Sequence, residues 1–284
     1  MVVLGAVLWQ RDHSIAAGLA WSFAIVTKPF LGLLVLFLLR KKDFKGAFAT
    51  LAFSGSLFVG SFIFAFSDPL QIFQDWRTST HWHTGLPNVA KPDNQTFYGF
   101  FNRLFVDAKY STPIFDYPTA PLLLMIPVVA LAIYIFVYAV SEQKNVGDRG
   151  GPKTFLEIAI TLALFMACGP FMEGDHVFVL LPGLFGALLL YFGSYDRRWL
   201  VASVLWLLAF ANLFLPIGVN QFRPPYWPKL EGLMILRSLH YGLIFFVAAA
   251  YSGFVLHSDR MKGIHSTRVD GDDARADLEA EVSA

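Results

Sequence analysis

Three titratable residues in one short turn have the types and spacing to carry chemistry: Glu173, Asp175 and His176. The segments on either side, Thr154–Cys168 and Val177–Gly193, are almost entirely apolar, which places the turn at a membrane surface. A charged group in hydrocarbon costs roughly 3 kcal/mol or more. A carboxylate beside an imidazole can exchange protons or hold a cation. Two interpretations stay open: a functional acid/base turn and a hydrated helix end.

Basic residues elsewhere suit an anionic ligand. Arg237 and His240 lie three residues apart and share one face of a predicted helix. An arginine at membrane depth must face a cavity or a partner, and phosphate is a natural ligand through paired hydrogen bonds. The alternative is that the Arg237 side chain extends to the membrane surface. Lys28, which precedes Pro29, is a second candidate phosphate ligand.

The elements that must position these residues are membrane helices. The chain has 284 residues, of which 56% are hydrophobic and only 15% charged, and its mean hydropathy is +0.53. Soluble domains are usually about 25% charged. Several apolar runs reach the roughly 17–25 residues that cross a bilayer. We therefore predict an all-α, polytopic transmembrane helical bundle, with no phosphate-binding glycine loop, no soluble nucleotide domain and no nucleic-acid partner.

The first predicted span contains a break at Thr27-Lys28-Pro29. Proline removes a helix hydrogen bond and disfavours helical angles in the residue before it. The span is therefore either one kinked helix or two half-helices. The predicted spans are Ser14–Leu39, Ala47–Phe66, Leu122–Val140, Thr154–Cys168, Val177–Gly193, Trp199–Leu215 and Leu233–Leu256.

The orientation of the spans follows from the basic loops. Arg40–Lys45 is the densest basic cluster and should face the cytoplasm. Alternation then places the loop Ser67–Pro121, the Glu173–His176 turn and Pro216–Glu231 on the outer side. We thus predict a transmembrane domain over residues 1–256.

Two further segments have distinct compositions. The outer loop is long and rich in aromatic residues, which is typical of a functional loop rather than a disordered one. Its stretch Phe97–Val106 has aromatics at helical spacing and predicts a helix in the membrane interface. Residues 257–284 are predicted to form a cytoplasmic, acidic, disordered tail.

Three segments in order resemble those of glycosyltransferase family 87. Ala16–Lys45 resembles its small-residue helix, Lys-Pro break, second apolar helix and basic loop. Asn94–Leu104 is similar to its Asn-Gln-Ser/Thr, Gly, Arg-Leu segment. Gly169-Pro170 through Asp175-His176 to Leu181-Pro182 is similar to its Ser-Pro, Trp-x-His-His, Leu-Pro segment, with Glu173 and Asp175 in place of the tryptophan and the first histidine.

This resemblance implies a membrane-embedded enzyme of the GT-C type in a prokaryotic plasma membrane. Such an enzyme takes a hexose, expected to be mannose, from a polyprenyl-phosphate donor and passes it to a lipid or glycan acceptor on the outer face. The implied reaction is an inverting transfer that needs no metal and no cofactor, with a carboxylate as general base. Membrane lipids are further expected partners.

The resemblance also implies site residues. We expect Asp175 and His176, with Glu173, to be the acid/base or acceptor-hydroxyl ligands. We expect the lipid-linked substrate to be bound by Lys28, Asn94, Gln95, Arg103, Arg237 and His240. The family's principal catalytic aspartate is expected in a loop upstream of this sequence, so the chain resembles an enzyme that lacks its N-terminal part. The alternatives are a transporter or lipid-binding membrane protein, and an inactive glycosyltransferase fragment.

Overall fold

The computed structural model describes residues 1–65, 68–84, 89–91, 94, 96–141, 151–169, 178–214 and 242–261. These residues are helical with short connections, and within them the only β pairing is an isolated bridge between Ala108 and Ser111. Among the described residues, three helices are long and apolar enough to cross a membrane: Phe44–Phe64, Ala120–Ala139 and Gly242–Met261. The predicted all-α, polytopic membrane fold is confirmed.

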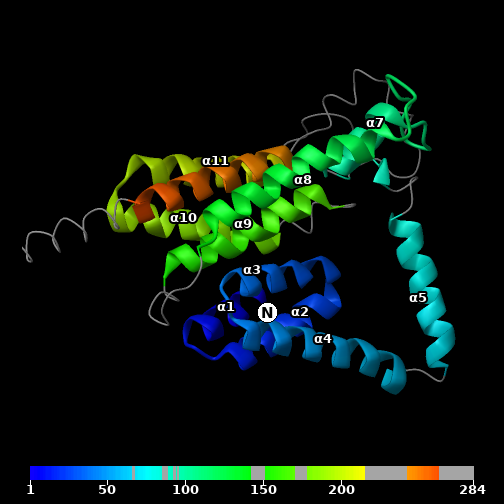
Figure 1. Ribbon diagram of the computed structural model, residues 1–284, viewed down its shortest axis with the longest axis horizontal. Helices are drawn as coiled ribbons and strands as arrows, with labels where there is room; N and C mark the ends of the chain where they lie inside the picture. The colour runs from blue at the N-terminus through cyan, green and yellow to red at the C-terminus, as the bar shows by residue number, and fades with distance from the viewer. Residues whose placement is uncertain are drawn as a thin grey trace, which may run out of the picture.

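The first helices form one group at the bottom of Figure 1. They are α1 (Val2–Gln10), α2 (Ser14–Thr27), the 3-10 helix η1 (Pro29–Leu33), α3 (Leu34–Arg40) and α4 (Phe44–Ala65). Helices α2 and α4 pack closely, because a Cβ on Gly18 would lie 2.9 Å from the Thr50 backbone nitrogen. The Ser22 hydroxyl also donates to the Thr50 carbonyl at 3.0 Å. Small residues therefore allow these two helices to approach.

The predicted break in the first span is confirmed. Helix α2 ends at Thr27, and a 3-10 helix starts at Pro29. Lys28 between them is extended, with φ −139° and ψ 93°. Proline at the first position of a helix is favourable, since its missing N–H would have no intrahelical partner there. The span thus becomes two helices joined by a tight corner.

The second group is a bundle above the first, formed by α8 (Ala120–Ala139), α9 (Pro152–Cys168), α10 (Leu181–Ser194), α11 (Arg197–Phe214) and Gly242–Met261, the orange helix in Figure 1. Helix α9 is its centre and is buried along most of its length. Small residues again set the packing. A Cβ on Gly253 would lie 2.5 Å from the Cβ of Ala139.

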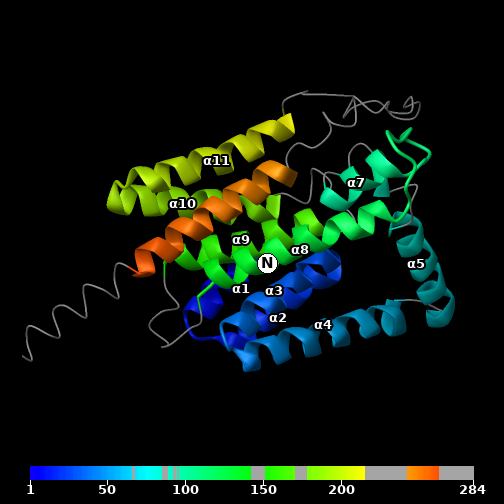
Figure 2. The same ribbon diagram turned by 45° about the horizontal axis from the view of Figure 1, so that its top comes forward.

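Helices α5 (Pro69–Thr84) and α7 (Phe97–Phe105) lie in the described part of the predicted outer loop. Helix α5 stands apart from the bundle in Figure 2 and contacts α4 through a cluster of aromatic rings, Phe58, Phe62, Phe73 and Trp76. Helix α7 matches the predicted helix at Phe97–Val106 and lies beside the start of α8. The helix Gly242–Met261 extends past residue 256, so the first residues of the predicted tail are helical.

Charged residues join the two groups at one end of the molecule, which we call the basic end. The described residues 40–44, 140–141, 151–152 and 194–197 lie there. The Lys41 amine is 2.5 Å from the Glu157 carboxylate, and both side chains are 5% exposed. The Arg260 guanidinium is 3.0 Å from the same carboxylate. The guanidinium of Arg40 donates to the carbonyls of Val137 and Val140 at 2.9 Å. These contacts hold α3, α8, α9 and the helix Gly242–Met261 together at the basic end.

Candidate active site

Three of the predicted site residues lie in the part of the chain that the structure describes. They are Lys28, Asn94 and Arg103. The other predicted site residues lie outside the described residues: Glu173, Asp175, His176, Gln95, Arg237 and His240. In Figures 1 and 2 the corner between α2 and α3 and the helix α7 lie toward the same end of the molecule, opposite the basic end.

Asn94 and Arg103 are brought together in a buried arrangement that we call the α7 knot, formed by Val89, Lys91, Asn94, Thr96 and Arg103. Both side chains are fully buried. The Asn94 amide donates to the Val89 carbonyl at 2.8 Å, and its oxygen accepts from the Thr96 N–H at 3.3 Å. The Arg103 Nη1 donates to the carbonyls of Lys91 and Asn94 at 2.7 and 2.8 Å. Arg103 therefore organises the loop before its own helix, and its role as a phosphate ligand stays a prediction.

Local chemistry explains why a helix starts at this point. The Thr96 hydroxyl accepts from the Gly99 N–H at 2.9 Å, a cap that satisfies one of the exposed donors of the first turn. Gly99 must be small, because a Cβ there would lie 2.6 Å from the Asn94 side-chain nitrogen and 3.0 Å from the Val89 carbonyl oxygen. Asn94, Thr96 and Gly99 of the sequence pattern thus have a shared structural role in the knot.

The α7 helix is fixed to the bundle by an aromatic contact. The ring of Phe97 meets the ring of Phe246 edge to face, with 5.4 Å between centroids. Phe246 belongs to the last helix, so α7 is held against a segment far away in sequence. Such pairs contribute about 0.5–1.5 kcal/mol beyond burial. The α7 knot is therefore a fixed part of this end of the bundle.

Lys28 lies in the corner between α2 and η1 and is partly buried. Its backbone N–H donates to the Ala24 carbonyl at 2.9 Å, and its own carbonyl accepts from the Leu31 N–H at 3.0 Å. The extended backbone between two helices puts the side chain at a helix end rather than within a continuous helix. A lysine at such a corner can hold a phosphate as a point charge.

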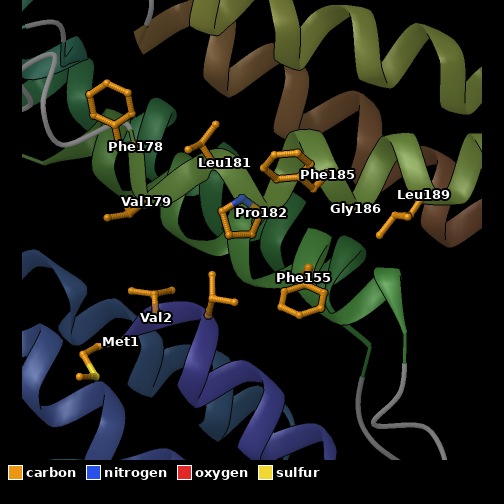
Figure 3. A pocket seen from close by; sticks show the side chains of 11 residues that line it. Met1, Val2, Phe155, Phe178, Val179, Leu181, Pro182, Phe185, Gly186 and Leu189 are labelled. Atoms are coloured by element: carbon orange, nitrogen blue, oxygen red, sulfur yellow. The ribbon is translucent and has the colours of Figure 1, made fainter.

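An apolar groove runs between the start of α1 and α10, with a volume of about 520 Å³. In Figure 3 the side chains of Met1 and Val2 lie on one side of the groove and those of α10 on the other, with Phe155 of α9 below them. The lining residues from the α10 side are Phe178, Val179, Leu181, Pro182, Phe185, Gly186 and Leu189. In sequence, Phe178 and Val179 follow the Glu173–His176 turn after a single intervening residue. The groove has the shape and lining to accept a hydrocarbon chain.

The sequence pattern did not predict that two buried carboxylates, those of Glu157 and Asp43, hold several helices together. Glu157 lies inside the predicted span Thr154–Cys168, and an acidic residue in an apolar span is itself a signal of a buried partner. Asp43 was counted only within the basic cluster. Its carboxylate accepts from Trp9 Nε1 at 2.8 Å, the Ser14 hydroxyl at 2.6 Å and the Gly46 N–H at 2.9 Å. Both carboxylates hold helices together rather than face a cavity.

Within the described ranges, no three His, Cys, Asp or Glu side chains converge as a metal site would require. The chain matches the model of Glycosyltransferase family 87 over residues 1–168, which is more than half of its length. The matched part includes the Lys28 corner, the α7 knot and α9, and it ends before the Glu173–His176 turn. Neither a curated protein nor a solved structure matches the chain. The chain belongs to glycosyltransferase family 87 and is a membrane glycosyltransferase.

Proposed function

We propose that the protein transfers a hexose, with mannose as the first candidate, from a polyprenyl-phosphate donor to a lipid or glycan acceptor at the outer face of a prokaryotic plasma membrane. The family match carries this proposal, since it covers the Lys28 corner and the α7 knot in the order that the sequence pattern requires. Cytoplasmic loops of membrane proteins carry an excess of Lys and Arg, so the basic end would face the cytoplasm. The opposite end, with the Lys28 corner and the α7 knot, would then face outward.

A lipid-linked donor is supported by the apolar groove between α1 and α10. A polyprenyl chain needs an apolar path at membrane depth, and the groove supplies one of about 520 Å³. Phe178 and Val179 connect it in sequence to the Glu173–His176 turn. A chain bound in the groove would leave its phosphate and sugar near that turn. Burial of each methylene group contributes about 0.8 kcal/mol to such binding.

The proposed reaction is an inverting displacement. The Asp175 carboxylate, paired with His176 and assisted by Glu173, takes the proton of the acceptor hydroxyl. The hydroxyl oxygen forms a bond to the anomeric carbon of the sugar. The bond between that carbon and the phosphate oxygen breaks, and the polyprenyl phosphate leaves with the electron pair. Cationic side chains stabilise the charge that develops on the phosphate.

The proposed binding residues divide between phosphate and sugar. Lys28 and Arg237 would stabilise the leaving phosphate. Arg103 would either bind the same phosphate or hold the α7 knot in the shape that binds the substrate. The amides Asn94 and Gln95 and the imidazole of His240 are proposed to hydrogen-bond the sugar or acceptor. None of these roles requires a metal ion.

The test is a transfer assay with the full chain in proteoliposomes. Radiolabelled polyprenyl-phosphate mannose and the corresponding glucose compound would serve as donors, with total membrane lipid as acceptor. Wild-type protein should transfer label from one donor, and Asp175→Asn should reduce the rate by at least 100-fold, on the order of what general base catalysis supplies. Asp116→Asn is the matched control, because Asp116 is an exposed carboxylate outside the proposed site. Full activity in Asp175→Asn would refute the base assignment, and lack of transfer from both donors would refute the proposed donor class.

A further inference from the structure

A second cavity lies at the basic end, far from the α7 knot. It has a volume of about 480 Å³ and is formed where α1 turns into α2 and α4 begins. The lining residues are Asp12, His13, Ser14, Ile15, Ala16, Leu19 and Lys45. We call this cavity the α2–α4 pocket. Its lining is polar at the helix starts and apolar further along α2, so the pocket is amphipathic.

The polar part of the pocket carries one fixed charge of each sign. Asp12 lies in the turn between α1 and α2 with φ +64°, and Lys45 lies in the first turn of α4. Both side chains are exposed, as is that of His13, which makes no capping hydrogen bond to α2. The nearby Asp43, whose carboxylate accepts from Trp9, Ser14 and Gly46, does not line the pocket. The polar lining therefore complements a zwitterion.

The apolar part of the pocket continues as a stripe along α2. Ile15, Leu19 and Phe23 follow one another at intervals of four residues, and their exposed fractions are 48%, 41% and 47%. Residues four apart lie on the same helix face. An exposed apolar stripe on a short apolar helix of a membrane protein is suited to contact with hydrocarbon. A chain that starts in the pocket can lie along the stripe for about two helical turns, on the order of 11 Å.

The pocket also lies at the level of a membrane surface. It shares the basic end with Arg40, Lys41 and Lys42, and basic residues cluster at the cytoplasmic boundary of membrane proteins. An amphipathic pocket at this level, with charges at the rim and an apolar stripe toward the membrane interior, matches the shape of a phospholipid: a charged headgroup attached to acyl chains.

We propose that the α2–α4 pocket binds a phospholipid with a primary-amine headgroup, such as phosphatidylethanolamine. The lipid phosphate would pair with Lys45 and accept from His13, the ammonium would donate to Asp12, and one acyl chain would lie along Ile15, Leu19 and Phe23. A headgroup that is only anionic would be repelled by Asp12. A choline headgroup has no N–H with which to donate. This site is separate from the proposed catalytic end and does not rest on the proposed reaction.

The experiment uses the full chain in nanodiscs that contain a trace of phosphatidylethanolamine with a photoactivatable diazirine in its acyl chain. After illumination, labelled peptides would be mapped by mass spectrometry. Label should concentrate on the Asp12–Phe23 segment. Unlabelled phosphatidylethanolamine should compete about threefold to fivefold better than phosphatidylglycerol or phosphatidylcholine, the range expected for an exposed charge pair. Label spread evenly over exposed positions of other helices, such as Phe48 in α4 and Leu123 in α8, would overturn the proposal.

Two variants separate the headgroup contacts. Lys45→Gln should weaken labelling of the segment severalfold, whereas Lys153→Gln, which removes an exposed charge at the same end but outside the pocket, should leave it unchanged. Asp12→Asn should retain labelling but lose the preference over phosphatidylglycerol, and asparagine tolerates the left-handed backbone at this position. Equal labelling in Lys45→Gln and Lys153→Gln, or an unchanged lipid preference in Asp12→Asn, would refute the assigned contacts.

Discussion

The two ends of the helical bundle are stabilised in different ways. At the basic end, contacts join segments that are far apart in sequence: Glu157 and Arg260 are separated by 103 residues, and Arg40 and Val140 by 100. At the opposite end, the α7 knot is local, and Arg103 and Lys91 are only 12 residues apart. The basic end therefore determines which helices are neighbours. The hydrogen bonds of the α7 knot determine the shape of a single loop, and the Phe97–Phe246 contact fixes that loop against the bundle.

The largest expected effect comes from removing the shared carboxylate of the basic end. Glu157→Gln leaves the buried Lys41 amine without its counter-charge, and breaking a buried ion pair by removing one partner costs about 3–5 kcal/mol. The thermal unfolding temperature of the detergent-solubilised protein should fall clearly. The double variant Lys41→Met/Glu157→Leu should recover part of the loss, because no uncompensated lysine remains and the Arg260 side chain that loses the same carboxylate is 25% exposed. An unfolding temperature in Glu157→Gln equal to that of wild type would contradict the role of the network.

A smaller and more local effect is expected in the α7 knot from Arg103→Met. This variant removes the donors to the carbonyls of Lys91 and Asn94 and leaves buried acceptors unsatisfied, at a cost of about 1–3 kcal/mol. Hydrogen exchange should accelerate in residues 89–105 and remain unchanged in α9. Faster exchange throughout the bundle would show that the knot is not local.

A pair of glycine variants compares the closely packed α7 knot with an open position on α4. Gly99→Ala introduces a Cβ against the Asn94 side chain and the Val89 carbonyl and should cost about 1–3 kcal/mol. Gly55→Ala, within α4 with no atom near its Cβ, should instead stabilise the protein by about 0.5–1 kcal/mol. Both effects can be measured by chemical unfolding followed by tryptophan fluorescence. Equal changes in the two variants would show that the close approach at Gly99 is not sterically limiting.

The smallest effect is expected from Arg198→Gln. Arg198 pairs with Asp196 at 2.5 Å and Asp259 at 2.6 Å, but its side chain is 31% exposed. Partly exposed pairs contribute at most about 1 kcal/mol and are screened by salt. The stability difference from wild type should be detectable at low ionic strength and should shrink in 1 M salt (roughly 3 Å screening length). A loss of stability as large as that in Glu157→Gln would contradict the expectation that, at the basic end, buried ion pairs contribute more to stability than partly exposed ones.

The helices and their break could be predicted from the sequence because these features depend on local chemistry. Proline at position 29 has no N–H in any context, so the interruption after Thr27 follows from one residue. The apolar runs similarly predict the helical spans, because a chain that crosses hydrocarbon must pair its own backbone groups and expose apolar side chains. Helix α7 is an intermediate case: its aromatic spacing predicts a helix, but its contact with Phe246 does not follow from local sequence.

The contacts of long polar side chains could not be predicted in the same way. Arg103 was expected to bind a phosphate, yet its Nη1 donates to two carbonyls of the preceding loop. An arginine has five donors, and the sequence does not indicate which acceptor each one meets. Glu157 likewise gives a signal of burial but not the identity of Lys41 and Arg260 as partners. Such pairings depend on the tertiary arrangement of helices that are distant in the chain.

The carboxylate of Asp43 has a consequence for the order of assembly. It accepts from Trp9 of α1, Ser14 of α2 and Gly46 of α4, and these three partners lie within the first 50 residues. Chains emerge from the ribosome N-terminus first, at roughly 5–20 residues per second. Helices α1 and α2 and the start of α4 can therefore pair around Asp43 while α8 to α11 are still being synthesised. The N-terminal group then offers the later helices a preformed surface on which to dock.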